Sequence, residues 1–126
     1  MYFVESKYFD GDDFHLNAIV KTKKEAETME QPSFINERRI RKVNLPADPE
    51  ERFNMAVGVL MDDGMCIEEC IADFSVEIVW GDWKHAHLRA DYLMEQFGFK
   101  AVDEYVTEDD GSDTYSSIHK YEYVGR

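Results

Sequence analysis

The chain has 126 residues, of which 44% are hydrophobic, so it is long and apolar enough for one packed domain over residues 1–126, and a disordered chain is excluded. It contains no apolar run of membrane-spanning length, and Met1–Glu5 lacks the basic start and long apolar core of a signal peptide. We therefore expect a soluble, cytoplasmic protein with no membrane partner.

The formal net charge of −13 is unevenly distributed along the chain. Residues 1–47 carry eight acidic and eight basic residues, residues 48–113 carry 18 acidic and four basic, and residues 114–126 carry one acidic and two basic. We call residues 48–113 the acidic segment. Its charge repels nucleic acid, which argues against direct DNA or RNA binding by that surface, and it attracts basic protein partners.

The first third of the chain predicts two strands followed by a short helix. Tyr2–Phe9 is rich in aromatic residues and Val, and Phe14–Val20 carries apolar residues at every second position, so the two predict strands joined as a hairpin. Thr22 and Glu25 have the spacing of a capping box, which predicts a helix that ends near Glu30.

Residues 34–45 predict a further strand, in which Arg38–Lys42 holds four cations in five positions. Cations protect the edge of a sheet against pairing with another sheet, so a solvated edge strand is the first interpretation. A second interpretation is a counterpart to the acidic segment, within the chain or in another subunit. A third, a phosphate-binding strand, is disfavoured by the acidity of the rest of the chain.

The middle of the chain predicts one clear helix and one ambiguous element. Asp48-Pro49 followed by two acids is typical of a helix start, and this helix is expected to end at Asp62–Gly64. Residues 65–72 show helical spacing of apolar residues, which predicts a short helix, although so short a run could equally extend the next strand. Cys66 and Cys70 in this run are expected to be small buried side chains.

The stretch after this run predicts a strand, a tight turn and a helix, around which the other elements are arranged. Phe74–Trp80 alternates as a half-buried strand, and Asp82 is a suitable N-cap. Trp83–Phe97 places its apolar residues on one side of a helix, and Gly98 supplies the left-handed residue that ends it.

Two further strands, 99–107 and 114–124, complete the chain and are expected to be joined by a hairpin loop. In the last strand Ser117, His119 and Tyr121 share one face. The order of elements predicts an α+β fold with two to four helices packed on one face of a mainly antiparallel sheet.

Histidines are the candidate metal ligands of this chain. His85 and His87 stand near the start of a predicted helix, where their side chains diverge and cannot chelate one ion. His119 and nearby acids could complete a site only if the fold brought them together, because zinc needs three or four converging ligands. We therefore expect no metal. The sequence also has no glycine-rich phosphate loop and no nucleophile elbow, so we expect no cofactor and no catalytic residue, and an enzyme is the less favoured class.

The expected partner-binding surface combines an apolar pair with carboxylates. Leu88 and Tyr92 lie four residues apart on the predicted helix, outside its core stripe. Either another layer of the fold covers them or they form an exposed contact patch. The acidic segment supplies the expected docking carboxylates: Asp62, Asp63, Glu68, Glu69, Asp103, Glu104, Asp109, Asp110 and Asp113.

In its size, its acidic segment and its α+β pattern, the chain resembles small acidic accessory proteins of phages and mobile elements. The stretch from Gly81 to Ser116 also resembles uncharacterised proteins carried by phages. Some of these proteins are anti-restriction or anti-CRISPR inhibitors that imitate nucleic acid. The resemblance implies a non-enzymatic, DNA-mimic-like inhibitor that docks on the basic surface of a nucleic-acid-binding protein, and it carries over no functional residue.

Two alternatives remain. The first is a small metal-dependent enzyme that uses His85, His87 or His119. The second is a homo-oligomer in which Arg38–Lys42 of one subunit meets the acidic segment of another. The inhibitor hypothesis requires that carboxylates gathered in the sequence also gather in space.

Overall fold

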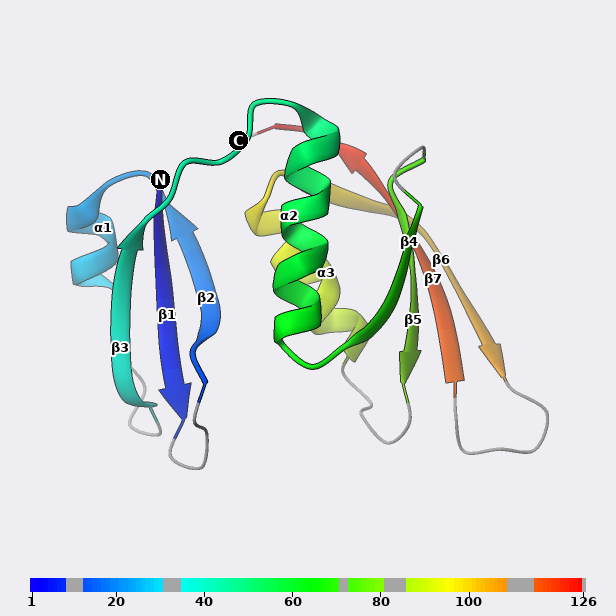
Figure 1. Ribbon diagram of the computed structural model, residues 1–126, viewed down its shortest axis with the longest axis horizontal. Helices are drawn as coiled ribbons and strands as arrows, with labels where there is room; N and C mark the ends of the chain where they lie inside the picture. Colours follow the sequence, from blue (N-terminus) through cyan, green and yellow to red (C-terminus); the bar gives the residue numbers. More distant parts are fainter. Residues whose placement is uncertain (9–12, 31–34, 71–72, 81–85, 109–114, 126) are drawn as a thin grey trace. The chain divides into compact units, whose positions relative to one another are not determined.

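The computed structural model describes residues 1–8, 13–30, 35–70, 73–80, 86–108 and 115–125. The fold class is α+β, as predicted, with antiparallel sheets of three and four strands and, in the described ranges, three helices. The chain divides into two compact units, Met1–Leu45 and Pro46–Arg126, and each is described by itself (Figure 1). We call them the N-terminal unit and the C-terminal unit. The single domain expected from the sequence stays a prediction.

The N-terminal unit is a three-stranded sheet with one short helix. Its strand order is β2-β1-β3, so the cation-rich strand lies at an edge, as predicted. The predicted hairpin between the first two strands is confirmed, since Tyr2 pairs with Val20. Thr22 caps the helix by accepting a hydrogen bond of 3.1 Å from the Glu25 N–H, as the capping pattern predicts. The elements are β1 (Tyr2–Tyr8), β2 (His15–Val20), α1 (Lys23–Thr28) and β3 (Ile35–Lys42).

The C-terminal unit is a four-stranded antiparallel sheet in the order β4-β5-β7-β6, with two helices on one of its faces (Figure 1). On that face Val76 and Ile78 are buried together with Phe53 and Leu60, which belong to the first helix of this unit. These apolar residues form the core of the unit. Its elements are α2 (Pro49–Asp62), β4 (Cys66–Cys70), β5 (Ser75–Trp80), α3 (Ala86–Gln96), β6 (Phe99–Glu108) and β7 (Tyr115–Tyr123).

Both predicted long helices are confirmed where the structure describes them. Asp48 caps α2 by accepting from the Glu51 N–H at 3.1 Å, and Pro49 occupies its first turn. The start of the other helix, including Asp82, lies outside the described residues. α3 ends before Gly98, which has a φ of 92°. A side chain at this position would also come within 3.0 Å of the Gly125 backbone, so both conformation and space require glycine.

The short helix predicted for residues 65–72 is wrong, because Cys66–Cys70 forms strand β4 instead. It pairs antiparallel with β5, Cys66 opposite Val79 and Cys70 opposite Ser75. The apolar spacing was too short to distinguish the two states, and the backbone hydrogen bonds offered by the edge of β5 decide for a strand. The expectation of buried cysteines is also wrong for Cys66, which is exposed with a free thiol.

Phe74 differs from its prediction as the first residue of a strand. Its φ of 50° lies in the left-handed region, which costs a bulky residue about 1–2 kcal/mol. Its ring centroid lies 5.3 Å from that of Phe53 and 5.4 Å from that of Phe99. Its carbonyl accepts the Tyr121 N–H at 2.9 Å. Aromatic pairs contribute about 0.5–1.5 kcal/mol each beyond the area they bury, so this packing offsets the backbone strain.

Candidate functional site

The whole net charge belongs to one unit. Residues 1–45 hold eight acidic and eight basic residues, whereas residues 46–126 hold 19 acidic and six basic, a net of −13. The boundary between the two compact units, after Leu45, therefore nearly coincides with the start of the acidic segment at residue 48.

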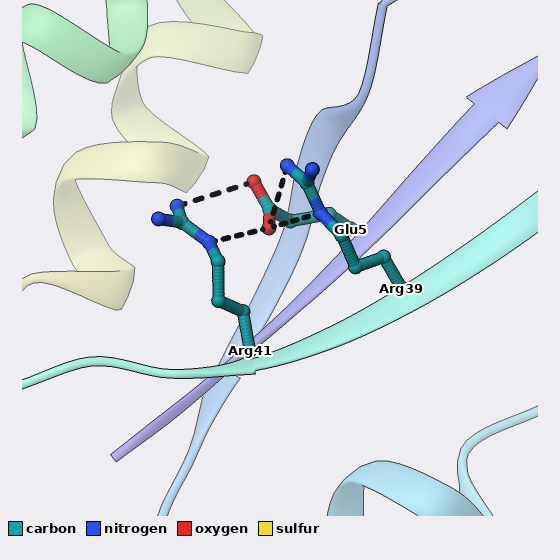
Figure 2. Close-up of polar contacts among 3 residues, drawn as sticks. All are labelled: Glu5, Arg39 and Arg41. Atoms are coloured by element: carbon teal, nitrogen blue, oxygen red, sulfur yellow. Dashed lines mark hydrogen bonds and ion pairs between the residues drawn. The ribbon is translucent and has the colours of Figure 1, made fainter.

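The three arginines of β3 have partners inside the N-terminal unit. Figure 2 shows Glu5, on the neighbouring β1, between Arg39 and Arg41. Glu5 Oε1 lies 3.0 Å from Arg41 Nε and 3.1 Å from Arg39 Nη2, and Glu5 is only 7% exposed. Arg38 donates to the carbonyls of Met29 and Glu30 after α1, each at 2.7 Å. The counterpart of these three arginines is thus found within their own unit.

Four of the residues expected to supply docking carboxylates belong to the two edge strands of the four-stranded sheet. Glu68 and Glu69 belong to β4 at one edge, and Asp103 and Glu104 belong to β6 at the other. Three strand spacings separate β4 from β6, or about 14 Å, so the structure does not bring these two pairs together. Asp109, Asp110 and Asp113 lie outside the described residues.

Two neighbouring aspartates at the end of α2 differ in their exposure and in their contacts. Asp62 is exposed, whereas the Asp63 side chain is 8% exposed and its Oδ2 lies 3.0 Å from Arg89 Nε on α3. Asp63 thus joins the two helices and is not an available docking group. In this it differs from Asp62, Asp103 and Glu104, whose side chains are exposed.

The predicted apolar pair on α3 is exposed. Leu88 is 57% and Tyr92 41% exposed, so the alternative in which another layer covers them does not hold. The Arg89 guanidinium lies 5.7 Å from the Tyr92 ring centroid. The same arginine that binds Asp63 therefore also supports one member of the pair.

A second group of polar side chains converges between α3 and the sheet. Asp91 of α3, Glu104 of β6 and His119 of β7 each offer one ligand atom, and these atoms lie within 4.8 Å of one another. Sequence reasoning named His119 as a conditional ligand and Glu104 as a docking group, but it missed Asp91. The polar face of the last strand was the available signal. The sequence did not indicate which helix residue would lie over that face.

His119 is held by polar contacts on both sides of its ring. Nε2 lies 2.7 Å from Ser117 Oγ, and Nδ1 lies 3.6 Å from Asp91 Oδ1. The Tyr121 hydroxyl donates to the same Asp91 oxygen at 2.7 Å. Burial, together with the negative charges of Asp91 and Glu104, raises the pKa of Tyr121, so this hydroxyl stays protonated and acts as a donor.

A β-bulge in β6 directs Glu104 toward His119. Ala101 pairs with Tyr121, yet the next pairing is Asp103 with Lys120, so Val102 is an extra residue. Glu104 consequently stands opposite His119, on the face that the helices cover. In a regular ladder Asp103 would occupy that position.

Ser117, His119 and Asp91 are the residue types of a hydrolytic triad, but their surroundings do not suit that chemistry. A nucleophilic serine must reach the substrate carbonyl, and Ser117 is 0% exposed. The Nδ1–carboxylate separation is also too long for the hydrogen bond that orients a catalytic histidine. His85 lies outside the described residues, as does the side chain of His87.

Comparisons of the chain with protein-family models, with curated proteins and with solved structures found no match. Among the described residues, no helix has both the length and the apolar character needed to cross a membrane.

Proposed function

We propose that the C-terminal unit is an acidic, non-enzymatic binding module that docks on the basic, nucleic-acid-binding surface of another protein and inhibits it. The observation that supports the proposal is uncompensated charge. Between described residues of this unit, one ion pair joins a carboxylate to a Lys or Arg, that of Asp63 with Arg89. Asp62, Asp103 and Glu104 are exposed. Asp103 accepts hydrogen bonds from the Glu104 N–H and the Tyr105 hydroxyl, which leave its charge in place.

One of these acids stands where a charge opposes folding. Asp62 is the last residue of α2, where the helix dipole disfavours an anion. Residues that oppose stability are often kept for function, which favours a role for this charge beyond the fold.

The acidic edges of the sheet do not form one patch, since the edge strands β4 and β6 are about 14 Å apart. The proposal therefore requires a basic groove that is wide enough to contact both edges at once. Exposed Leu88 and Tyr92 would add an apolar contact, since tyrosine is enriched at energetically important positions of interfaces.

Competition against DNA tests the proposal. The protein is immobilised at low salt, captured proteins are identified, and each is then loaded with a fluorescent DNA duplex. We expect the soluble protein to displace the duplex at about 50 mM salt and to lose most of this effect at about 300 mM, because exposed ion pairs are screened.

The control is a double variant, Asp62→Asn and Asp103→Asn, which should displace the duplex at least about tenfold less well. Tight binding of DNA by the protein itself, or displacement that the variant retains in full, would contradict the proposal. Size-exclusion chromatography at both salt concentrations covers the oligomer alternative, which requires a salt-sensitive mass above that of a monomer.

The proposal includes a cytoplasmic location. The exposed free thiol of Cys66 is compatible with a reducing compartment.

A further inference from the structure

The polar group beneath α3 has the composition of a metal site. One imidazole nitrogen and two carboxylates come from three different elements, and their ligand atoms converge to within 4.8 Å. His119 forms the buried base at 1% exposure, Asp91 is half-buried and Glu104 is exposed at the rim. An ion could enter from the side of Glu104.

We propose that Asp91, Glu104 and His119 bind one divalent metal ion, preferably Zn²⁺, with Nδ1 of His119 as the nitrogen ligand. This site does not depend on the proposed function.

The separation between His119 Nδ1 and Asp91 Oδ1 is the first argument. At 3.6 Å it exceeds the range of a hydrogen bond, although the histidine is almost fully buried. Two ligands that each lie about 2.1 Å from a tetrahedral ion are about 3.4 Å apart. The observed spacing therefore suits a shared ion, and the exposed Glu104 side chain is able to rotate toward it.

The contacts around the ligands are the second argument. With a proton on Nε2, His119 donates to Ser117 Oγ at 2.7 Å, which leaves the Nδ1 lone pair directed at Asp91. Tyr121 donates to the Asp91 carboxylate at 2.7 Å. Hydrogen bonds of this kind orient metal-binding histidines and carboxylates in proteins.

The ligand set is the third argument, because it selects among ions. A buried imidazole disfavours Ca²⁺ and Mg²⁺, which prefer all-oxygen ligands, and favours a borderline ion. Zn²⁺ accepts nitrogen and carboxylate ligands together in a tetrahedral site, with water in the fourth position. The two carboxylates also balance its double charge.

Calorimetric titration of the full chain with ZnCl₂, after dialysis against a chelator, tests the proposal. We expect one saturable site per chain. Glu104→Gln and His119→Ala should each lower the affinity for Zn²⁺ at least about tenfold. Glu104 is exposed, so its variant is expected to fold even where the variant of the buried His119 fails.

The matched controls are Glu122→Gln, on the same strand as His119, and Glu95→Gln, on the same helix as Asp91. Both residues are exposed and both substitutions remove one negative charge, yet both variants should bind Zn²⁺ like the parent protein. Nitrogen NMR of the histidine rings should show the Zn²⁺-induced shift at His119 Nδ1 and not at Nε2. Absence of a saturable site, equal losses in the control variants, or a shift at Nε2 would overturn the proposal.

Discussion

The two units of this protein treat charge in opposite ways. In the N-terminal unit the acids and bases are equal in number, and a nearly buried Glu5 binds two arginines while a third binds backbone carbonyls. In the C-terminal unit acids outnumber bases by 13, and the described residues provide one ion pair with Lys or Arg. Ion pairs and hydrogen bonds of charged side chains support the fold of the first unit, whereas the described residues of the second unit show fewer ion pairs with Lys or Arg.

This difference shows how little the total charge of a chain says about its surface. Arg39 and Arg41 appear in the sequence as cations available to neutralise the acidic segment. In the structure their common partner is Glu5, 34 and 36 residues earlier in the chain. The compensation is therefore local to one sheet.

The largest expected effect comes from removing Glu5. Glu5→Gln leaves Arg39 and Arg41 without their common carboxylate, and because both arginines are half-exposed we expect a loss of about 2 kcal/mol in the free energy of unfolding. Urea unfolding followed by circular dichroism measures it. Glu37→Gln is the control, since its contact with Lys7 is 3.8 Å long and exposed, and it should cost less than about 0.5 kcal/mol.

The same variant tests the single domain predicted from the sequence. Both tryptophans, Trp80 and Trp83, belong to the C-terminal unit, so their fluorescence follows that unit, whereas circular dichroism follows both. One cooperative domain requires that Glu5→Gln lowers both unfolding midpoints equally. A shift seen by circular dichroism alone would contradict the single domain.

The next effect concerns the ion pair between Asp63 and Arg89 in the C-terminal unit. Arg89→Ala removes the cation beside the nearly buried Asp63 carboxylate, and we expect a loss of about 1–2 kcal/mol, measured by tryptophan fluorescence in urea. Arg89→Lys keeps the charge but not the shape of the donor, so it should recover only part of the loss. An unchanged midpoint in Arg89→Ala would show that the pair contributes nothing to folding.

The smallest effect has the opposite sign. Asp62→Asn removes an anion from the C-terminal end of α2 and should stabilise the protein by about 0.5 kcal/mol. Glu50→Gln removes the same charge from the first turn and should destabilise it by a similar amount. Thermal unfolding of both variants provides the comparison. If both were stabilising, repulsion within the unit would outweigh the helix dipole.

The sequence predicted most elements because their signals are local. The cap at Asp48, the hairpin of β1 and β2 and the left-handed Gly98 each depend on residues close together in the chain. Residues 66–70 were misassigned because their state depends on pairing with β5.

The candidate metal site depends on long-range features that no local pattern reports. Asp91 and His119 are 28 positions apart, and the face that Glu104 occupies is set by one extra residue in β6. The acids at the two sheet edges posed a related difficulty. Nothing in the sequence around Glu68 and Glu69, or around Asp103 and Glu104, indicates that two strands of the sheet lie between these pairs.

The extra residue Val102 makes β6 tolerant of a change in its length at this point. Deleting it would leave Asp103 opposite Lys120 and Glu104 opposite His119, so β6 would pair with β7 as a regular ladder and each later side chain would keep its face. Asp103 would stand opposite His119 only if Val102 were kept and paired with Lys120. Natural variants of this strand are therefore expected to tolerate the loss of one residue at this position.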